Sequence, residues 1–291
     1  MKKTATLKEI GRRLAISLYE AVFPSTCSIC LKIIDVSWND TPYSEKEIQL
    51  KYSQVARGEA DFRRVMAFNL CPKCISEFTP VESPICTQCG LMFRNRGGKD
   101  RLCNRCSMKP NLFTMARAYG TYDQSLKEAV HRYKYREDTG LADPFSLLLF
   151  STFVKHWDIS DVDIITPVPL HIKRFRKRGF NQAYLMFRKW HRMAEKMDTD
   201  ISHIRFEKEI VIRTRATETQ VGMDHKERTR NLKDAFRAKD ISKIKGKRIV
   251  LMDDVLTTGS TANACVKEIL RHGPRQVDVL TLAQTEKKKG F

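Results

Sequence analysis

Paired cysteines constrain the fold of this chain more than any other feature of its sequence. Eight of its nine cysteines form four Cys-x-x-Cys pairs, all within the first 110 residues. Two residues between the cysteines of a pair allow both sulfur atoms to bind one tetrahedral ion at about 2.3 Å. The pattern therefore predicts two structural zinc sites, with these ligands: Cys27, Cys30, Cys71, Cys74, Cys86, Cys89, Cys103 and Cys106.

Two other uses of the cysteines agree less well with the sequence. A disulfide framework needs an oxidising compartment, and we recognise no secretion signal in the chain. Redox chemistry at one Cys-x-x-Cys pair does not explain four pairs. Because all eight ligands are cysteines, no coordination position is left open, and we expect the ions to stabilise structure rather than to catalyse.

The grouping of the four pairs is left open by the sequence. Grouping in chain order places thirteen residues between Cys89 and Cys103, close to the spacing of a zinc ribbon. In the first group the gap is forty residues, 31–70, and its charged, periodic middle at 45–68 predicts an inserted helix. We expect residues 25–110 to form a small double zinc-ribbon domain that carries the insertion 31–70.

The first residues of the chain predict an amphipathic helix over 1–24. Their apolar side chains follow helical spacing and are interrupted by charges, unlike those of a signal peptide: Leu7, Ile10, Leu14, Leu18 and Val22. The longest strongly apolar run, residues 145–154, is too short to span a bilayer. These observations favour a cytoplasmic protein without a transmembrane segment.

Positive charge dominates the chain. There are 53 Lys and Arg residues against 34 Asp and Glu residues, a formal net charge of +19. This excess favours an anionic partner, such as nucleic acid, a phosphorylated metabolite or an acidic membrane surface. The hydrophobic fraction of 42% excludes a wholly disordered chain.

The pattern of the chain changes after residue 110. Apolar runs typical of strands, at 113–120, 161–169, 210–213, 248–252 and 277–283, alternate with helical patterns at 125–135, 180–197 and 261–272. Strands that alternate with helices indicate an α/β domain with a mostly parallel sheet, here over residues 111–291. The ninth cysteine, Cys265, shares a helical face with Ala262 and Ile269 and is predicted to be a core residue.

One segment of this domain, residues 249–261, combines an apolar strand, two acids and a loop of small residues. The acids are Asp253 and Asp254, and they are followed by Val255, Leu256, Thr257, Thr258, Gly259, Ser260 and Thr261. Ligands of parallel sheets bind beyond the carboxyl ends of the strands, where we expect the two acids to lie. The loop can fold its backbone N–H groups around a phosphate, and the acids can accept hydrogen bonds from sugar hydroxyls. An ordinary strand end followed by a helix cap is the alternative.

The segment resembles the diphosphoribosyl-binding signature of type I phosphoribosyltransferases at all thirteen positions. The resemblance implies that Asp253 and Asp254 contact the ribose, as the catalytic pair, and that residues 255–261 hold the 5-phosphate of phosphoribosyl diphosphate. It also implies a diphosphate-binding loop after another strand, here Pro169, Leu170 and His171. Mg²⁺ is then expected to bridge the diphosphate oxygens and the ribose hydroxyls.

Other segments of the chain indicate which family of phosphoribosyltransferase-like proteins it resembles. Phe23-Pro24 precedes the first cysteine pair, Lys134-Tyr135 ends a predicted helix, and residues 167–171 read Pro-Val-Pro-Leu-His. Arg-Gly-Phe-Asn-Gln follows at 178–182, and then come Gln220 and Arg228-x-x-Asn231. Together with the zinc ribbons and the diphosphoribosyl signature, these segments are similar to those of the ComF family, the late-competence proteins of bacteria. The insertion 31–70 departs from the family's pattern.

Three polar segments allow more than one interpretation. Residues 173–178 hold five basic side chains in six positions, which could attract a diphosphate or a nucleic-acid backbone, or simply form a solvated loop. Residues 178–182 could surround the ligand or cap a helix. Residues 213–231 resemble a flexible lid, from which Arg213, Arg215 or Arg228 could reach the diphosphate, or form a plain surface loop.

Two functions follow from these resemblances. ComF membership implies a protein that binds phosphoribosyl diphosphate with Mg²⁺ and takes part in handling imported single-stranded DNA, alongside competence DNA-uptake proteins. The alternative is an active phosphoribosyltransferase that acts on an unknown nitrogenous acceptor and does not bind DNA directly. No acceptor pocket is recognisable in the sequence, and aromatic residues do not interleave densely with arginines as a base-stacking groove requires.

Overall fold

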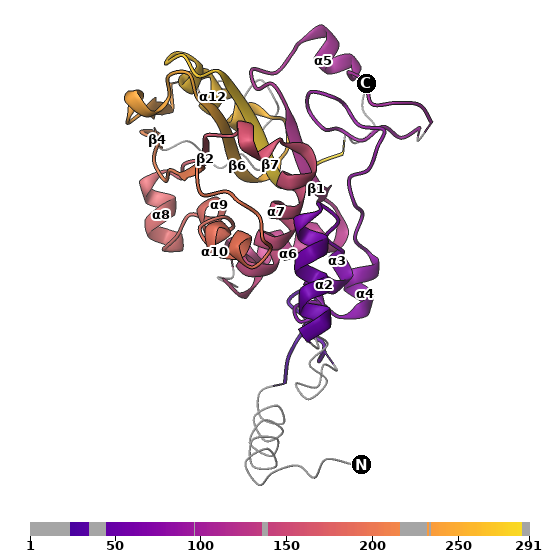
Figure 1. The fold of residues 1–291 in the computed structure, drawn as a ribbon. Coiled ribbons are helices and arrows are strands. Elements are labelled where there is room, and N and C mark those ends of the chain that lie inside the picture. The colour runs from indigo at the N-terminus through magenta and orange to yellow at the C-terminus, as the bar shows by residue number, and fades with distance from the viewer. Residues whose placement is uncertain are drawn as a thin grey trace, which may run out of the picture.

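The structure is a computed structural model that describes residues 24–34, 45–95, 97–135, 139–215, 232 and 234–286. The helix expected over residues 1–24 lies outside these residues except for Pro24, as do Gln220, Arg228 and Asn231. Within the described residues, the two cysteine-containing regions pack onto an α/β unit (Figure 1).

Five parallel strands form the central sheet. Their spatial order is β1, β7, β6, β2, β3, and every neighbouring pair is parallel. The strands are β1 (Ala116–Thr121), β2 (Ile164–Pro167), β3 (Arg205–Phe206), β6 (Arg248–Leu256) and β7 (Gln276–Gln284). A separate antiparallel pair consists of β4 (Val211–Arg213) and β5 (Phe236–Ala238). The predicted α/β class with a mostly parallel sheet is confirmed.

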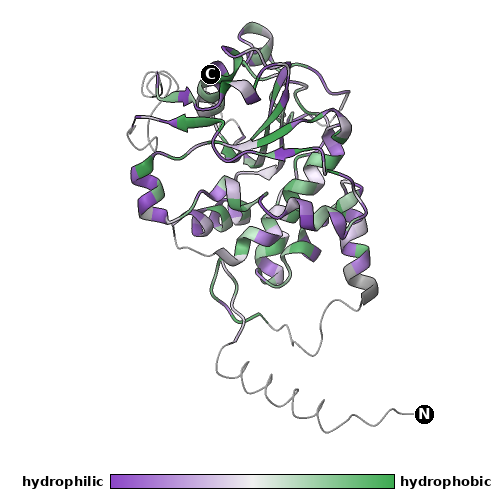
Figure 2. Ribbon diagram, turned by 60° about the vertical axis from the view of Figure 1, so that its left-hand side comes forward, coloured by the Kyte–Doolittle hydropathy of each residue, from purple (hydrophilic) through white to green (hydrophobic). Residues whose placement is uncertain are grey.

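Side chains of the central strands alternate between two hydrophobic cores. In β6, Val250 and Met252 belong to one core, and Ile249 and Leu251 to the other. The first core also holds α6 (Gln124–Tyr135), α7 (Ala142–His156), α9 (Gln182–Leu185) and α10 (Trp190–Glu195), and the second holds α12 (Ser260–Leu270). Cys265 is buried in the second core, as predicted. Figure 2 shows hydrophobic residues gathered in the sheet and in the helices against it, which explains why the strands read as continuous apolar runs.

The apolar run at 145–154 lies within α7, which is buried along most of its length. α7 packs against β1 and β7, and also against α2 (Glu45–Ala56) and α3 (Phe62–Met66). A helix covered by neighbours all round needs apolar residues on its whole circumference, which explains its composition. In the described part of the chain, no helix is long and apolar enough to cross a bilayer.

The insertion forms two helices, α2 and α3, where one was predicted over residues 45–68. The chain turns between them at Gly58, which has a φ angle of +74°. Val55, Phe62 and Met66 belong to the same core as α7, and the Phe62 ring stacks on Phe78 with centroids 3.8 Å apart. The insertion is therefore held by packing against the α/β unit as well as by its neighbouring cysteines. Two short helices begin at cysteines, α4 (Pro72–Ser76) and α5 (Asn104–Met108).

The helix predicted over residues 180–197 is also divided, into α9 and α10. α8 (Ile172–Arg178) precedes them and ends at Gly179, which has a left-handed backbone conformation. Asn181 Oδ1 then accepts a hydrogen bond of 3.0 Å from Ala183 N and caps α9. Residues 178–182 thus end one helix and cap the next, which was one of the two interpretations. The described residues also contain three short 3-10 helices: Thr139–Leu141, Ile159–Asp161 and Ile241–Lys243.

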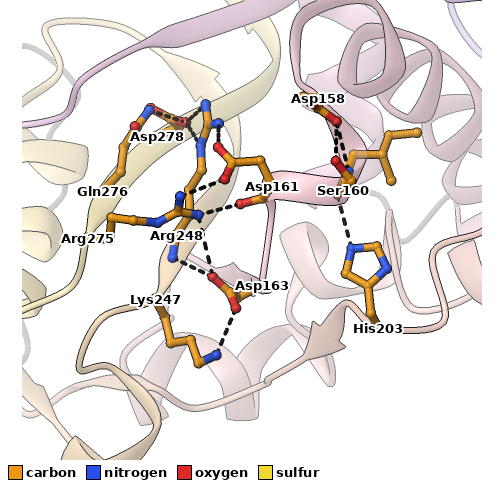
Figure 3. Close-up of polar contacts among 11 residues, drawn as sticks. Asp158, Ser160, Asp161, Asp163, His203, Lys247, Arg248, Arg275, Gln276 and Asp278 are labelled. Atoms are coloured by element: carbon orange, nitrogen blue, oxygen red, sulfur yellow. Dashed lines mark hydrogen bonds and ion pairs between the residues drawn. The ribbon is translucent and has the colours of Figure 1, made fainter.

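An ion-pair network holds the amino ends of the central strands (Figure 3). Arg248, the first residue of β6, donates from Nη2 to Asp278 Oδ2 at 2.9 Å and also contacts Asp161. Asp278 is fully buried and accepts a further hydrogen bond of 2.8 Å from Trp157 Nε1. Arg275 contacts Asp161 at 2.6 Å. A buried carboxylate is tolerated here because charged and polar donors surround it.

Candidate functional site

The acidic pair lies where the two neighbours of β6 end at different points. β6 pairs with β2 only as far as Met252, but with β7 as far as Leu256. Asp253 and Asp254 therefore lie within β6, whereas the sequence predicted that the strand ends at residue 252. The strand is longer because β7 continues to hydrogen bond to it after β2 has ended. The acids consequently lie beside the carboxyl end of β2, at the edge of the sheet where parallel sheets bind their ligands.

Lys134 forms an ion pair with one of the two acids. Its Nζ atom lies 2.6 Å from Asp254 Oδ1, and the two side chains are 17% and 13% exposed. Burial disfavours the ammonium charge, but Asp254 outweighs burial and keeps the pKa of Lys134 above its ordinary value. In the sequence, Lys134 stands out only as part of a family pattern. No spacing rule links the last turn of α6 to a strand so much later in the chain.

Asp253 is the other member of the pair. Burial, followed by repulsion from the Asp254 carboxylate, raises the pKa of Asp253 to about 7, while Lys134 and Arg213 act in the opposite direction. Two adjacent carboxylates favour a cation or a set of hydrogen-bond donors that allows both to ionise. Carboxylate oxygens are also the ligand type that Mg²⁺ prefers, so the residues present fit a divalent cation.

The Thr257–Thr261 loop leads from β6 into α12. Gly259 has a φ angle of +78°, and a Cβ atom there would lie 3.3 Å from Asn111 Oδ1, so conformation and space both favour glycine. Within the described residues, the backbone N–H groups of Thr258 and Gly259 donate to no protein acceptor. Free N–H groups at the start of a helix are suited to binding an anion.

A second set of free N–H groups follows β2. Val168 N donates to Met252 O at 2.8 Å, which fixes the start of this loop beside the acidic pair. As far as the structure describes the chain, the N–H groups of Leu170 and His171 have no protein acceptor. This loop can therefore present two donors to a ligand.

Pro169 and His171 differ in the groups that they can offer to a ligand. Pro169 has no N–H group to offer, so only its two successors can donate from the backbone. His171 is buried, and its Nδ1 atom accepts a hydrogen bond of 3.2 Å from Lys173 N. The imidazole therefore caps α8.

The basic run 173–178 is helical rather than a loop, because it makes up most of α8. Ile172 and Phe175 on this helix are 51% and 42% exposed. The guanidinium carbon of Arg178 lies 4.8 Å from the centre of the Tyr135 ring, and Tyr135 follows Lys134 in α6. α6 therefore connects the basic helix with the acidic pair.

The expected lid is described only in part. Arg213 ends β4 and is buried, with its guanidinium carbon 5.4 Å from the centre of the Phe236 ring. Its charge acts on Asp253. Residues 216–231, including Arg228, lie outside the described residues.

A cleft of about 970 Å³ adjoins the Thr257–Thr261 loop. Its walls come from the ends of β1, β6 and β7 and from the cysteine-containing segment 89–113, and they include Arg105, Phe113, Tyr122, Leu256 and Gln284. The lining combines apolar and aromatic side chains with polar and charged ones, such as Asn111, Asp123 and Lys127, and so offers both contact area and hydrogen-bonding groups to a small polar molecule. The sequence could not reveal this cleft, because its walls come from separate parts of the chain.

The structure groups the cysteines in chain order. The first cysteine group contains Cys27, Cys30, Cys71 and Cys74, and the second contains Cys86, Cys89, Cys103 and Cys106. The Sγ atoms of Cys30 and Cys71 are 3.7 Å apart, and those of Cys89 and Cys103 are 3.9 Å apart. Zinc bonded to sulfur at about 2.3 Å requires about 3.8 Å between tetrahedral ligands. Both groups therefore fit a zinc ion.

Hydrogen bonds to sulfur support the same conclusion. Cys89 N and Cys103 N each lie 3.4 Å from Cys86 Sγ, and Ile29 N lies 3.4 Å from Cys27 Sγ. The Cys89 thiol, followed by the backbone N–H groups of Cys103 and Cys89, lowers the pKa of Cys86 to about 4, while the same hydrogen bond and burial raise the pKa of Cys89. Because the thiolate is the form that binds metal, such donors favour a metal site.

Comparison with known proteins identifies the family. A phosphoribosyl transferase domain model matches residues 194–290, which contain the acidic pair. The DNA utilization protein YhgH of Escherichia coli K12 is 32% identical over 221 residues, which cover 75% of this chain and 91% of YhgH. Competence protein F of Haemophilus influenzae is 29% identical over 74% of this chain and 88% of its own length. The chain belongs to the ComF family. Its ComFC relative from Bacillus subtilis is 27% identical over 70% of this chain and 79% of its own length.

The structure brings together the residues that the resemblance to type I phosphoribosyltransferases singled out. Asp253, Asp254, the Thr257–Thr261 loop and the loop 169–171 meet at one edge of the sheet. Val255 and Leu256 continue β6 between the acids and the loop. The ion pair of Lys134 and the cleft leave no signal in the sequence, because both depend on contacts between distant segments.

Proposed function

We propose that this protein binds phosphoribosyl diphosphate with Mg²⁺ at the acidic pair and takes part in handling imported single-stranded DNA. The observation that supports the metabolite most is the presence of two sets of free N–H groups around one acidic pair. The first set, Leu170 and His171, follows Val168, whose N–H group donates to the carbonyl oxygen of the residue before Asp253. The second set, Thr258 and Gly259, follows the end of β6. Such an arrangement suits a sugar with a phosphate at one end and a diphosphate at the other.

Each part of the site has its own role in this proposal. Asp253 and Asp254 accept hydrogen bonds from the ribose hydroxyls, residues 255–261 hold the 5-phosphate, and residues 169–171 hold the diphosphate. Mg²⁺ supplies positive charge between the diphosphate and the hydroxyls when it is bound. Lys134 provides the counter-charge of Asp254 while the site is empty. Residues 111–291 form the phosphoribosyltransferase-like domain, and residues 25–110 form the zinc-ribbon domain.

Isothermal titration with phosphoribosyl diphosphate, with and without Mg²⁺, tests the metabolite site. We expect Mg²⁺-dependent binding, and a loss of at least about tenfold in affinity for Asp254→Asn, because a charged acceptor is removed. Asp240→Asn is the matched control, since it removes an acid from another Lys–Asp pair, with Lys243 at 3.4 Å, in the connection before β6. Equal affinity in Asp254→Asn and the wild type, or no binding by the wild type, would contradict the proposal.

The DNA-handling part of the proposal draws on the relatives and on α8. Relatives carry the names competence protein and DNA utilization protein. α8 exposes Phe175 among basic residues, a combination that can contact both the bases and the phosphates of a single strand.

Salt-dependent binding of a single-stranded oligonucleotide tests this role of α8. Each phosphate contact with a single strand contributes about 0.7 to the slope of log K against log salt. Replacing Lys173, Arg174 and Arg176 with Gln should therefore reduce the magnitude of this slope by about 2. The same charge change at the exposed residues Lys155, Arg192 and Lys196 is the control. Equal losses in both triple variants would mean that binding follows net charge and not α8.

An active phosphoribosyltransferase is the second candidate, and the cleft favours it. In that reaction a nitrogen atom of an acceptor forms a bond to C1 of the ribose while the C1–oxygen bond to diphosphate breaks. The cleft beside the Thr257–Thr261 loop is large enough for a heterocyclic acceptor. Release of diphosphate that requires an added nitrogenous acceptor would support this activity, and release at the same rate without one would oppose it.

A further inference from the structure

We propose that the second cysteine group positions the Thr257–Thr261 loop, so that ligand binding there depends on metal in this group and not on metal in the first. The inference rests on the proposed function for its ligand, but the contacts that support it are independent of any ligand. Two hydrogen-bonded links, through Arg105 and Asn111, join the second group to the loop and to the start of α12.

Arg105 forms the first link. It lies in α5 between the metal-ligand positions Cys103 and Cys106, and α5 begins at Cys103. From there its Nη2 atom donates to the backbone oxygen of Thr258 in the loop. The direction of the Arg105 side chain is therefore set by a five-residue helix that Cys103 caps and that contains Cys106.

Asn111 forms the second link. Its Nδ2 atom lies 3.4 Å from Cys106 Sγ, and its Oδ1 atom accepts a hydrogen bond of 2.9 Å from Asn263 Nδ2 in the first turn of α12. Leu112 N donates in turn to Asn263 Oδ1 at 2.7 Å. The same Asn111 oxygen packs close to Gly259, since a Cβ atom added to this glycine would lie only 3.3 Å from it. Asn111 therefore touches a metal ligand, α12 and the bend of the loop at once.

Metal binding controls the position of both residues. A helix as short as α5 is not stable by itself, because helices of fewer than about 12 residues are marginal in water. The second group has only a small hydrophobic cluster of its own, which consists of its four cysteines, Leu91 and Phe93. Cross-linking of its sulfur atoms by an ion therefore constrains α5 and with it Arg105. Asn111 is held by backbone hydrogen bonds with the side chain of Gln88, which lies between the ligand positions Cys86 and Cys89, and by Asn263.

The first cysteine group has different surroundings. Cys27, Cys71 and Cys74 belong to the large core that contains α3, α6 and α7. In Figure 1, α4 lies beside α2 and α3, whereas α5 lies near the opposite end of the molecule. Hydrogen bonds of the first group run to neighbours in that core: Arg132 of α6 donates to Ile29 O, and Ser28 N donates to Asn69 O. Metal in the first group should therefore support the helical core without affecting the loop.

Variants that keep all cysteines test the inference in the full-length, zinc-loaded protein. In Arg105→Gln we expect two zinc ions per chain by native mass spectrometry, and unchanged folding. Amide hydrogen exchange at residues 257–261 should become faster, and affinity for phosphoribosyl diphosphate should fall about tenfold, which is the usual effect of one lost hydrogen bond. Asn111→Ala should change both quantities in the same direction.

Arg132→Gln is the matched control. Arg132 Nη2 donates to the backbone oxygen of Ile29 beside the first group at 2.7 Å, just as Arg105 does for Thr258 beside the second. We expect its loop exchange and its affinity to equal those of the wild type. Exchange that is unchanged in Arg105→Gln, or equally fast in Arg132→Gln, would overturn the inference. If the wild type binds no phosphoribosyl diphosphate, the proposed function fails, but the exchange comparison still tests the link.

Discussion

At the scale of single residues, the ammonium group of Lys134 interacts with both members of the acidic pair. Lys134 Nζ lies 2.6 Å from Asp254 Oδ1, and its charge also acts on Asp253. Because burial and the neighbouring carboxylate oppose a second negative charge, Asp253 keeps its proton up to a pH of about 7. Asp253 is thus a carboxyl group that a bound cation or hydrogen-bond donors would allow to ionise at neutral pH.

Titration of the Asp253 carboxyl group by carbon-detected NMR checks this description. We expect a midpoint near pH 7 in the ligand-free protein. Asp254→Asn should lower the pKa of Asp253 by removing the repulsion, and Lys134→Met should raise it by removing the attraction. Asp163 is an internal reference: it is partly buried, but Lys247 and Arg248 N keep its pKa below the ordinary value. A midpoint for Asp253 near 4 in all three proteins would contradict the prediction.

The same group affects stability in a defined direction. Between pH 4 and pH 7 folded Asp253 holds a proton that the unfolded chain has released, because its folded pKa is about 7 and its ordinary value is 3.8. The free energy of unfolding should therefore fall as the pH rises through this range. Urea unfolding of Asp253→Asn should show a smaller fall over the same range, and an identical pH dependence would argue against the raised pKa.

At the scale of elements, the two ends of the central strands have different tasks. The carboxyl ends carry the acidic pair and the two loops with free N–H groups. The amino ends carry the network of Arg248, Asp278 and Trp157, in which the buried charge of Asp278 is matched by close donors. Stability and ligand binding can therefore be changed separately by mutation.

Asp278→Asn should destabilise the fold and spare the ligand site. Removing one partner of a buried ion pair costs about 3 kcal/mol, because the other charge stays buried without its counter-charge. We expect a loss of this size in the free energy of unfolding from urea denaturation. Asp161→Asn is the control, with a much smaller effect, because Asp161 is 37% exposed. Unchanged stability of Asp278→Asn would show that the network is not structurally important.

At the scale of the whole molecule, two metal groups support two different parts of one fold. The first group belongs to the core around α7, and the second contacts the Thr257–Thr261 loop through Arg105 and Asn111. We predict two zinc ions per chain by native mass spectrometry, and a fall of more than about 5 °C in the melting temperature after chelation, since both groups lose their cross-links. One ion per chain, or an unchanged melting temperature, would contradict the assignment of two structural zinc sites.

The sequence by itself determined the features that depend on local spacing. Four Cys-x-x-Cys pairs predicted four-cysteine sites, alternating strands and helices predicted a parallel sheet, and residues 249–261 located the acidic pair. Tertiary structure decided the rest. β6 extends past Asp253 because β7 pairs with it there, the apolar run 145–154 is buried because other elements cover α7, and residues 180–197 divide into two helices. The contacts of Lys134 with Asp254 and of Arg105 with Thr258 join segments far apart in the chain, and only folding brings such segments within hydrogen-bonding distance.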